Sequence, residues 1–206
     1  MSGVVVGDDG VSRCGWAAGD AGYEAYHDHE WGRPVHDDRQ LFEKLSLEAF
    51  QSGLSWLVIL RKREAFREAF AGFDIDRVAG FGDDDVQRLL GDVRIVRNRA
   101  KITAIIANAG ATRALIDDVG SLDSFLWAFA PAESGAAPVT LADVPAITPE
   151  STAMARALKR RGLKFVGPTT CYALMQAVGM VNDHLSDCAF RTATATPQAP
   201  SRSLRA

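Results

Sequence analysis

The sequence has little cysteine and no long hydrophobic run. Only three of its 206 residues are cysteine, which is too few for the disulfide framework of a small secreted protein. No stretch reaches the ~18 consecutive apolar residues of a membrane-spanning helix. The first residues also lack the basic and apolar segments of a signal peptide. We therefore expect a protein without disulfides or membrane spans, in a reducing, cytoplasmic compartment.

An excess of basic charge is also missing, since the net charge is −3 at pH 7. Broad, non-specific affinity for nucleic acid is therefore not expected. The basic residues are nevertheless clustered, and such clusters are either solvated helix faces or local phosphate-binding patches. Charge alone leaves both interpretations open. The two clusters are Arg94, Arg97, Arg99 and Lys101, and then Lys159, Arg160, Arg161 and Lys164.

Alternating β-branched residues are nearly absent, and apolar residues instead recur at helical spacing. One such stripe runs through residues 41–70, and three aspartates at 83–85 indicate the start of another helix. The pattern predicts an all-α protein with a single domain over residues 13–191. We expect a flexible leader at residues 1–12 and a disordered tail at residues 192–206.

Four potential metal ligands are divided between the two ends of the chain. Cys14 and His27 lie near the N-terminus, whereas His184 and Cys188 lie one helical turn apart near the C-terminus. Two thiolates and two imidazoles complete a tetrahedral Zn²⁺ shell, which leaves no open position for water. This set predicts a structural zinc that joins the two ends. Spacing alone is equally compatible with ordinary buried thiols and core histidines.

Residues 149–178 have the pattern of a helix-hairpin-helix. Thr148 is a helix-capping residue, Pro149 is the first residue of the helix, and Gly162 ends that helix. Pro168 then begins a second helix. Hairpin amides and the second helix's N-terminus would point at one spot, which suits a phosphate. The alternative is an ordinary αα-hairpin with a basic rim.

Glu48 is a carboxylate on an otherwise apolar helix face, because Leu41 and Leu45 precede it at helical spacing. Burying an unpaired carboxylate is costly, so this residue needs a partner or becomes protonated. The ordinary interpretation is a core carboxylate bonded to a Tyr or Arg. The sharper interpretation is a pocket for a flat, cationic heterocycle. The aromatic residues that would line it are Tyr23, Tyr26, Trp31 and Trp56.

A series of short motifs extends over about residues 13 to 190. They are Arg13-Cys14-Gly15-Trp16, Tyr26-His27-Asp28, Glu30-Trp31-Gly32, Leu47-Glu48 with Gln51, Gly53-Leu54-Ser55-Trp56, Arg97-Asn98-Arg99-Ala100-Lys101-Ile102, Lys164-Phe165-Val166-Gly167 and Val181-Asn182-Asp183-His184. In this order and at this spacing they resemble the bacterial 3-methyladenine DNA glycosylase I family. That resemblance covers nearly all of the chain expected to be ordered.

The resemblance implies a helix-hairpin-helix DNA glycosylase with one structural zinc, held by the four ligands already identified. It implies base-excision repair, in which the N-glycosidic bond of 3-methyladenine in double-stranded alkylated DNA is hydrolysed after base flipping. Free 3-methyladenine would be the product. We expect a monomer in the bacterial cytoplasm, associated with the nucleoid when on DNA.

The resemblance also assigns site residues position by position. Glu48 is implied as the catalytic-site carboxylate that recognises the base. The implied aromatic lining consists of Tyr23, Tyr26, Trp31 and Trp56, with Trp16 as a weaker candidate. The implied phosphate-binding residues are Arg161, Lys164, Gly167 and Thr169.

One motif departs from the wider superfamily. Many helix-hairpin-helix glycosylases carry an Asp in a Val-Asp-Thr-His-like motif, where Asn182 stands in this chain. An amide can neither act as a base nor offset positive charge. On a helix, Asp183 would point about 100° away from that position. We therefore expect the general base to be missing. No Lys occupies a nucleophile position in the matched motifs, which predicts a monofunctional enzyme without strand cleavage.

Two other classes of function remain open. One is a non-catalytic DNA-binding module that uses the hairpin for phosphates and zinc for stability. The other is a hydrolase with a catalytic zinc, for which His29 and His36 are spare ligands. Glu48 among aromatic residues favours the glycosylase, because binding to the DNA backbone does not require such a pocket.

Overall fold

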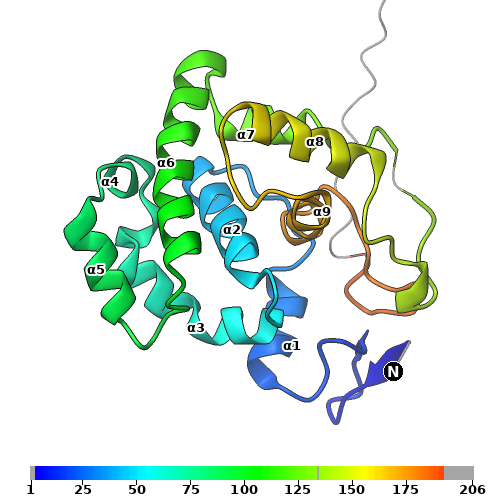
Figure 1. Cartoon of the computed structure of the whole chain (residues 1–206). Coiled ribbons are helices and arrows are strands. Elements are labelled where there is room, and N and C mark those ends of the chain that lie inside the picture. Colours follow the sequence, from blue (N-terminus) through cyan, green and yellow to red (C-terminus); the bar gives the residue numbers. More distant parts are fainter. Residues whose placement is uncertain (1–2, 134, 193–206) are drawn as a thin grey trace, which may run out of the picture.

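Helices dominate the part of the chain that the computed structural model describes, residues 3–133 and 135–192 (Figure 1). The prediction of a helical protein is therefore confirmed. In chain order the elements are β1 (Val4–Val6), β2 (Ser12–Cys14), α1 (Ala21–His29), α2 (Asp38–Gln51), α3 (Trp56–Ala69), the 3₁₀ turn η1 (Ala71–Phe73), α4 (Ile75–Ala79), α5 (Asp83–Gly91), α6 (Arg99–Val119), α7 (Leu122–Trp127), the 3₁₀ turn η2 (Leu141–Asp143), α8 (Pro149–Arg160) and α9 (Pro168–Ala177).

Several helices begin where their capping residues predicted. The Thr148 side chain accepts a hydrogen bond from the amide of Ser151 and so caps α8, with Pro149 at its first position. Helix α9 begins at Pro168, and α5 begins with three aspartates that favour the positive end of a helix dipole. The helix-hairpin-helix predicted at 149–178 therefore corresponds to α8 and α9.

Helix α2 lies in the middle of the molecule, between α6 and α9 (Figure 1). It also contacts α3 and α7, so most of its faces are covered by other helices. Its side chains Phe42 and Phe50 are fully buried and pack with Phe66, Phe70 and Phe73. Close packing on these covered faces fixes the rotation and position of α2. Any side chain that α2 presents to a pocket is therefore held by the core.

Lys101 fixes the C-terminal end of α2. Its side chain is only 7% exposed, and Nζ donates to the carbonyl oxygens of Phe50 (2.8 Å) and Ser52 (2.6 Å). Carbonyls at a helix C-terminus have no partner within the helix, and a cation there also complements the helix dipole. Burial lowers the pKa of Lys101. Its assignment to a basic surface cluster is corrected, because the ammonium faces the protein interior.

Asn108 pins the hairpin between α8 and α9 to α6. This side chain is 1% exposed; its Nδ2 donates to the Lys164 carbonyl (3.0 Å), and its Oδ1 accepts from the Lys164 amide (2.7 Å). The hairpin backbone is tightly turned, since Gly162 and Phe165 have φ values of 90° and 57°. The backbone amide of Lys164 is thus bound by Asn108, whereas the Lys164 side chain remains available for other partners.

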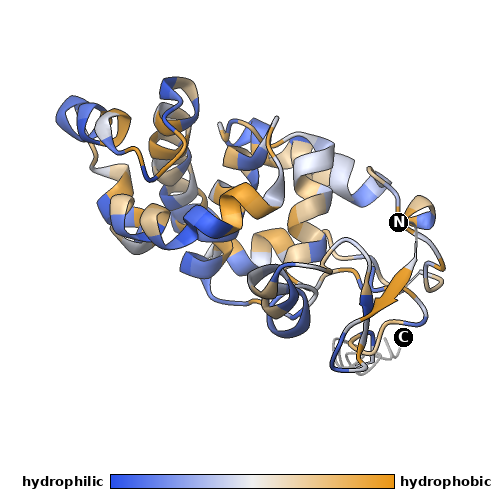
Figure 2. Cartoon of the chain, turned by 90° about the horizontal axis from the view of Figure 1, so that it is seen from below, coloured by the Kyte–Doolittle hydropathy of each residue, from blue (hydrophilic) through white to orange (hydrophobic). Residues whose placement is uncertain are grey.

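The two ends of the described chain lie together. Strands β1 and β2 pair antiparallel, with Val4 opposite Cys14 and Val6 opposite Ser12. The predicted flexible leader at residues 1–12 is thus corrected from residue 4 onward, because a β-branched run meets a turn closed by Gly7 and Gly10. The hydrophobic strand β1 is visible at this end in Figure 2. Ala189 donates its amide to Ser12 O (2.9 Å), and the predicted tail lies outside the described residues except for Thr192.

Within residues 3–133 and 135–192, no helix is both long and apolar enough to cross a membrane.

Replacing Asn108 with alanine tests whether α6 holds the hairpin. Asn108→Ala removes both hydrogen bonds to Lys164 and leaves two backbone groups without their partner. We expect a loss of about 1–3 kcal/mol in the free energy of unfolding, measured by urea denaturation. The exposed α6 residue Arg113 provides the control, and Arg113→Ala should change stability by less than about 0.5 kcal/mol. Equal stability of the two variants would contradict this role of Asn108.

Candidate active site

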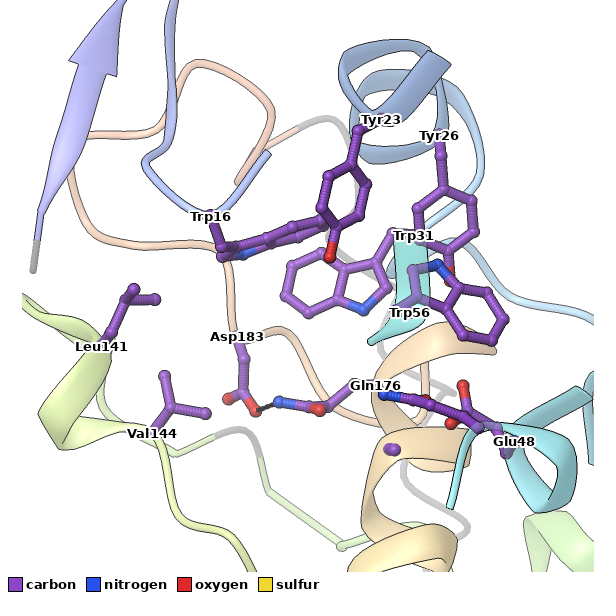
Figure 3. Close-up of a pocket in the computed structure, with 12 residues that line it drawn as sticks. Trp16, Tyr23, Tyr26, Trp31, Glu48, Trp56, Leu141, Val144, Gln176 and Asp183 are labelled. Carbon is purple, nitrogen blue, oxygen red and sulfur yellow. Dashed lines mark hydrogen bonds between the residues drawn. The ribbon is translucent and has the colours of Figure 1, made fainter. Parts of the chain in front are cut away.

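A pocket of about 290 Å³ opens among α1, α2, α9 and the turn η2 (Figure 3). The structure brings together here the carboxylate and all five aromatic residues that the sequence assigned to a base pocket. Trp16, the weaker candidate, is among them. The lining residues are Trp16, Tyr23, Tyr26, Trp31, Glu48, Gln51, Trp56, Leu141, Val144, Ala173, Gln176 and Asp183.

The aromatic side chains pack against one another and form one wall of the pocket. The Trp16 ring centroid lies 5.0 Å from that of Tyr23 and 5.0 Å from that of Trp31. Tyr26 and Trp56 form a second pair at 5.4 Å. These are ordinary separations for tilted or edge-on aromatic pairs, so the rings hold one another in place. A flat ligand can enter against faces that are already ordered.

Glu48 lies on α2 at the buried end of this pocket. It is only 5% exposed, and within the described residues its carboxylate makes no hydrogen bond or ion pair. Burial raises the pKa of Glu48 to about 8, against the opposing charge of Lys44. A cationic ligand beside it would favour the ionised form. Among the described residues, the buried Trp56 Nε1 donor also lacks a protein partner.

Sequence analysis missed half of the lining. Gln51 belongs to the matched motifs but was not assigned to the pocket, although it follows Glu48 by one helical turn on α2. Ala173 and Gln176 share a face of α9 in the same way. Leu141 and Val144 come from a loop whose sequence carries no periodic signal. These residues enter the pocket only because the chain folds back over it.

Asp183 also lines the pocket. This corrects the expectation that Asp183 lies on a helix and points about 100° away from the position of Asn182. Helix α9 ends at Ala177, and Asn182 and Asp183 lie outside any helix, so the 100° offset does not apply. Asp183 faces the pocket, where Tyr172 and Gln176 donate to it. Asn182 is instead engaged elsewhere. Its Nδ2 donates to the Arg191 carbonyl (2.8 Å), and its Oδ1 accepts from the His184 amide (3.3 Å).

The four predicted metal ligands meet in one buried cluster. Their ligand atoms all lie within 4.8 Å of one another, although Cys14 and Cys188 are far apart in sequence. His27 Nε2 lies 3.1 Å from His184 Nδ1 and 3.5 Å from Cys188 Sγ. A tetrahedral Zn²⁺ shell with bonds of about 2.0–2.3 Å places its ligand atoms roughly 3.3–3.8 Å apart. The residues present can therefore hold a metal ion.

Neighbouring groups orient this cluster. The Asp28 carboxylate holds the other ring nitrogen of His27, Nδ1, at 2.8 Å, and Arg13 in turn binds Asp28. This arrangement of carboxylate, imidazole and ligand position recurs behind metal-binding histidines. A hydrogen bond from Cys14, assisted by those from the two histidines, lowers the pKa of Cys188 against the effect of burial. A thiolate is the form that binds metal.

The spare histidines lie away from this cluster. His29 and His36 are both exposed, and His36 is bound to Asp123 at 2.8 Å. Neither joins the four ligands, so the arrangement does not favour a catalytic metal with an exchanged ligand.

The proposed phosphate-binding residues fall into two groups. Lys164, Gly167 and Thr169 lie on the hairpin and the first turn of α9, which has no side-chain cap. Arg161 instead forms an ion pair with Asp118 (2.6 Å) and lies over the Phe125 ring. Its guanidinium is directed to α6 and α7, which sequence spacing does not indicate.

Comparison with known proteins finds a single family over most of the chain. The profile of the family described as methyladenine glycosylase matches residues 16–192. DNA-3-methyladenine glycosylase 1 of Escherichia coli is 45% identical over 179 residues, which span 86% of this chain and 96% of the relative. DNA-3-methyladenine glycosylase of Haemophilus influenzae is 42% identical over 183 residues, spanning 88% and 99% of the two chains.

Solved structures agree with the sequence comparison. A crystal structure of 3-methyladenine DNA glycosylase I has a TM-score of 0.83 and 47% identity, and the match covers 86% of this chain and 98% of that one. A Staphylococcus aureus structure, described as the basis of 3-methyladenine recognition by 3-methyladenine DNA glycosylase I, has a TM-score of 0.83 and 35% identity. That match covers 87% of this chain and 96% of the other.

Replacing one cysteine of the cluster tests whether it holds a metal. Cys188→Ala removes one of four ligands, and we expect it to lose the single bound metal ion measured by elemental analysis. Because structural metal sites contribute on the order of 10 kcal/mol to folding, its melting temperature should fall far below that of the parent protein. Cys171 is also a free, buried thiol but lies outside the cluster, so Cys171→Ala should keep the metal. The metal site would be contradicted if the parent protein contained no metal and Cys188→Ala were as stable as the parent protein.

Proposed function

The chain belongs to the methyladenine glycosylase family, and we propose that it removes 3-methyladenine from double-stranded alkylated DNA as a monofunctional N-glycosyl hydrolase. The single observation that carries this proposal is Glu48, a buried carboxylate that lies inside an aromatic pocket and has no hydrogen-bond or ion-pair partner among the described residues. Such a pocket fits a flat base with positive charge and donor groups. A module that only grips the DNA backbone has no use for it.

The aromatic wall supports capture of a flipped base. An adenine methylated at N3 carries positive charge, so ring faces attract it by both stacking and cation–π interaction. Flipping a base out of the duplex costs a few kcal/mol, and less when the base is damaged. Stacking on aromatic side chains recovers about 1–3 kcal/mol per base. Trp16, Tyr23 and Trp56 are placed to provide these faces.

Glu48 supplies recognition of the adenine edge. Its carboxylate accepts a hydrogen bond from the exocyclic amino group, and its negative charge complements the cationic ring. A base with a carbonyl at the same place would bring an acceptor against an acceptor. Polar mismatches of this kind discriminate strongly, because they leave buried groups unpaired. Since burial raises the pKa of Glu48 to about 8, arrival of the cation would expel a proton from the pocket.

Breaking the glycosidic bond of 3-methyladenine does not require a general acid to protonate the leaving base. A cationic base leaves as a neutral molecule, so the glycosidic bond is already weakened and the base requires no proton. Water adds to the sugar, which gives free 3-methyladenine and an abasic site. No lysine belongs to the pocket lining of the described chain. A Schiff base with the sugar is therefore not expected, and neither is strand cleavage.

We infer that the metal is one structural Zn²⁺ per chain. It would be held by Cys14, His27, His184 and Cys188, a donor set that fills a tetrahedral shell. A filled shell does not bind substrate. When present, the ion would join strand β2 and helix α1 to the segment that follows α9. Trp16 lies 5.2 Å from the His27 ring, so this tie also supports the aromatic wall.

Contact with DNA is assigned to the hairpin and the start of α9. The uncapped amides at Gly167 and Thr169 suit a phosphate, with the exposed Lys164 side chain beside them. Arg161 would have to exchange its ion pair with Asp118 in order to take part. A monomer suffices for this arrangement. Its substrate implies a place on chromosomal DNA in a bacterial cytoplasm.

The activity is tested by chromatography of the bases released from methylated duplex DNA. We expect a 3-methyladenine peak, little 7-methylguanine and no strand breaks. A folded, metal-loaded protein that releases no base would favour the non-catalytic binding module instead.

Glu48→Gln tests base recognition. The variant keeps the shape of the side chain but loses its charge, and a charged hydrogen bond is roughly twice as strong as a neutral one. We expect the affinity for free 3-methyladenine, measured by calorimetry, to fall by about tenfold or more. Glu43 lies on the same helix but pairs with Arg67, so Glu43→Gln should bind normally. Unchanged affinity in the Glu48 variant would rule out this role.

The same variant should change how stability depends on pH. In the folded protein the pKa of Glu48 is raised to about 8, whereas in the unfolded chain it is near 4.5. Between these two pH values Glu48 is protonated in the folded protein and ionised in the unfolded chain. Stability is therefore lost as pH rises between these values, by up to about 1.4 kcal/mol per pH unit. Glu48→Gln should be more stable than the parent protein at pH 8, and this advantage should vanish below pH 4.5. Parallel stability curves in urea would contradict the burial of an unpaired acid.

A further inference from the structure

Asp183 lies on the side of the pocket away from Glu48. Figure 3 shows it near Leu141 and Val144, with Gln176 between it and the Glu48 side. It is partly buried, whereas Glu48 is nearly enclosed. The pocket thus has a carboxylate at its closed end and a second one nearer its opening.

Helix α9 fixes the orientation of this second carboxylate. Tyr172 Oη donates to Asp183 Oδ2 at 2.6 Å, and Gln176 Nε2 donates to the same oxygen at 2.7 Å. These donors are one helical turn apart. Burial, together with the hydrogen bond to Asp183, raises the pKa of Tyr172, so the phenol remains a donor. Within the described residues Oδ1 receives no hydrogen bond, which leaves that oxygen for a ligand.

The shape of adenine places the sugar beside Asp183. The exocyclic amino group and the glycosidic nitrogen N9 are at opposite ends of the purine. If the amino group binds Glu48, as the proposed function states, N9 and the sugar carbon C1′ lie towards the other end of the pocket. That end carries Asp183. Asn182 cannot fill this position, because its side chain is engaged with Arg191 and His184.

We propose that Asp183 is a catalytic residue whose carboxylate contacts the flipped nucleotide's sugar and stabilises the positive charge that develops there. The C1′–N9 bond breaks with its electron pair remaining on the base, which leaves as neutral 3-methyladenine. Positive charge then resides on the sugar, as in other glycoside hydrolyses. The oxygen of a water molecule bonds to C1′, and its proton passes to solvent. A fixed negative charge lowers this barrier most effectively in a site that excludes bulk water.

A second cavity gives water a place next to the carboxylate. It measures about 270 Å³ and shares Asp183 with the aromatic pocket. Tyr172 and Asn182 line the second cavity but not the first. Asp183 therefore forms part of the boundary between the two hollows.

Two abasic DNA duplexes test this charge directly. One carries a neutral tetrahydrofuran and the other a pyrrolidine, whose protonated nitrogen mimics the cationic sugar. We expect the parent protein to prefer the pyrrolidine duplex by about tenfold or more. Asp183→Asn should lose that preference while keeping its affinity for the tetrahydrofuran duplex. The neighbouring variant Asn182→Ala should keep both. A preference that persists in Asp183→Asn would overturn the proposal.

Excision rates give a second readout that separates chemistry from binding. Under single-turnover conditions, Asp183→Asn should release 3-methyladenine at least ~100-fold more slowly, which corresponds to about 2.7 kcal/mol of barrier. Its calorimetric affinity for free 3-methyladenine should stay within about twofold. A rate within about threefold of the parent protein would overturn the role. A parent protein that releases no base at all would refute the proposed function instead.

Metal analysis guards against a trivial loss of structure, because Asp183 precedes the ligand His184. If Asp183→Asn loses its metal, Tyr172→Phe replaces it as the test, since it removes one donor and no charge. That variant should keep the metal, excise about tenfold more slowly and show a weakened preference for pyrrolidine. Unchanged rate and preference in Tyr172→Phe would count against the proposal.

Discussion

Desolvation of one carboxylate is the constraint on which the rest of the site depends. Glu48 is almost completely buried and makes no hydrogen bond or ion pair with the described residues, an arrangement that needs a rigid support. Helix α2 provides that support, because core phenylalanines fix its middle and Lys101 binds the carbonyls at its end. The unfavourable burial is thus offset by packing elsewhere. In the proposed function, a cationic base would bind beside this carboxylate and favour its ionised form.

The metal cluster shapes the other side of the same pocket. Two lining residues lie next to its ligands in sequence, since Trp16 follows Cys14 closely and Asp183 precedes His184. Each is carried by a segment that lies outside the helices and strands. A metal ion held by the four ligands would join these segments at one buried point and give them the rigidity that a helix otherwise provides. The four-ligand cluster and the pocket therefore share the segments that carry Trp16 and Asp183.

Local chemistry explains which features could be predicted from sequence. The starts of α8 and α9 are specified by capping residues and prolines, and the four ligands are recognisable by type. Features set by distant contacts were missed. Lys101 resembles a surface cation until the end of α2 is known to need a donor, and Asp183 looked misdirected because a helix was assumed beyond Ala177. Leu141 and Val144 reach the pocket through a loop that no periodicity describes.

Helix α6 connects two features that otherwise appear unrelated. Lys101 holds the end of α2, and Asn108 holds the hairpin two helical turns further along the same helix. Residues at that separation share a face and lie about 10 Å apart along the axis. The helix therefore acts as a rigid spacer between the hairpin, which would grip a phosphate, and the helix that carries Glu48. A protein that held DNA by this hairpin would inspect one nucleotide at a constant offset from the bound phosphate, so its search for damage would proceed in register with the DNA backbone.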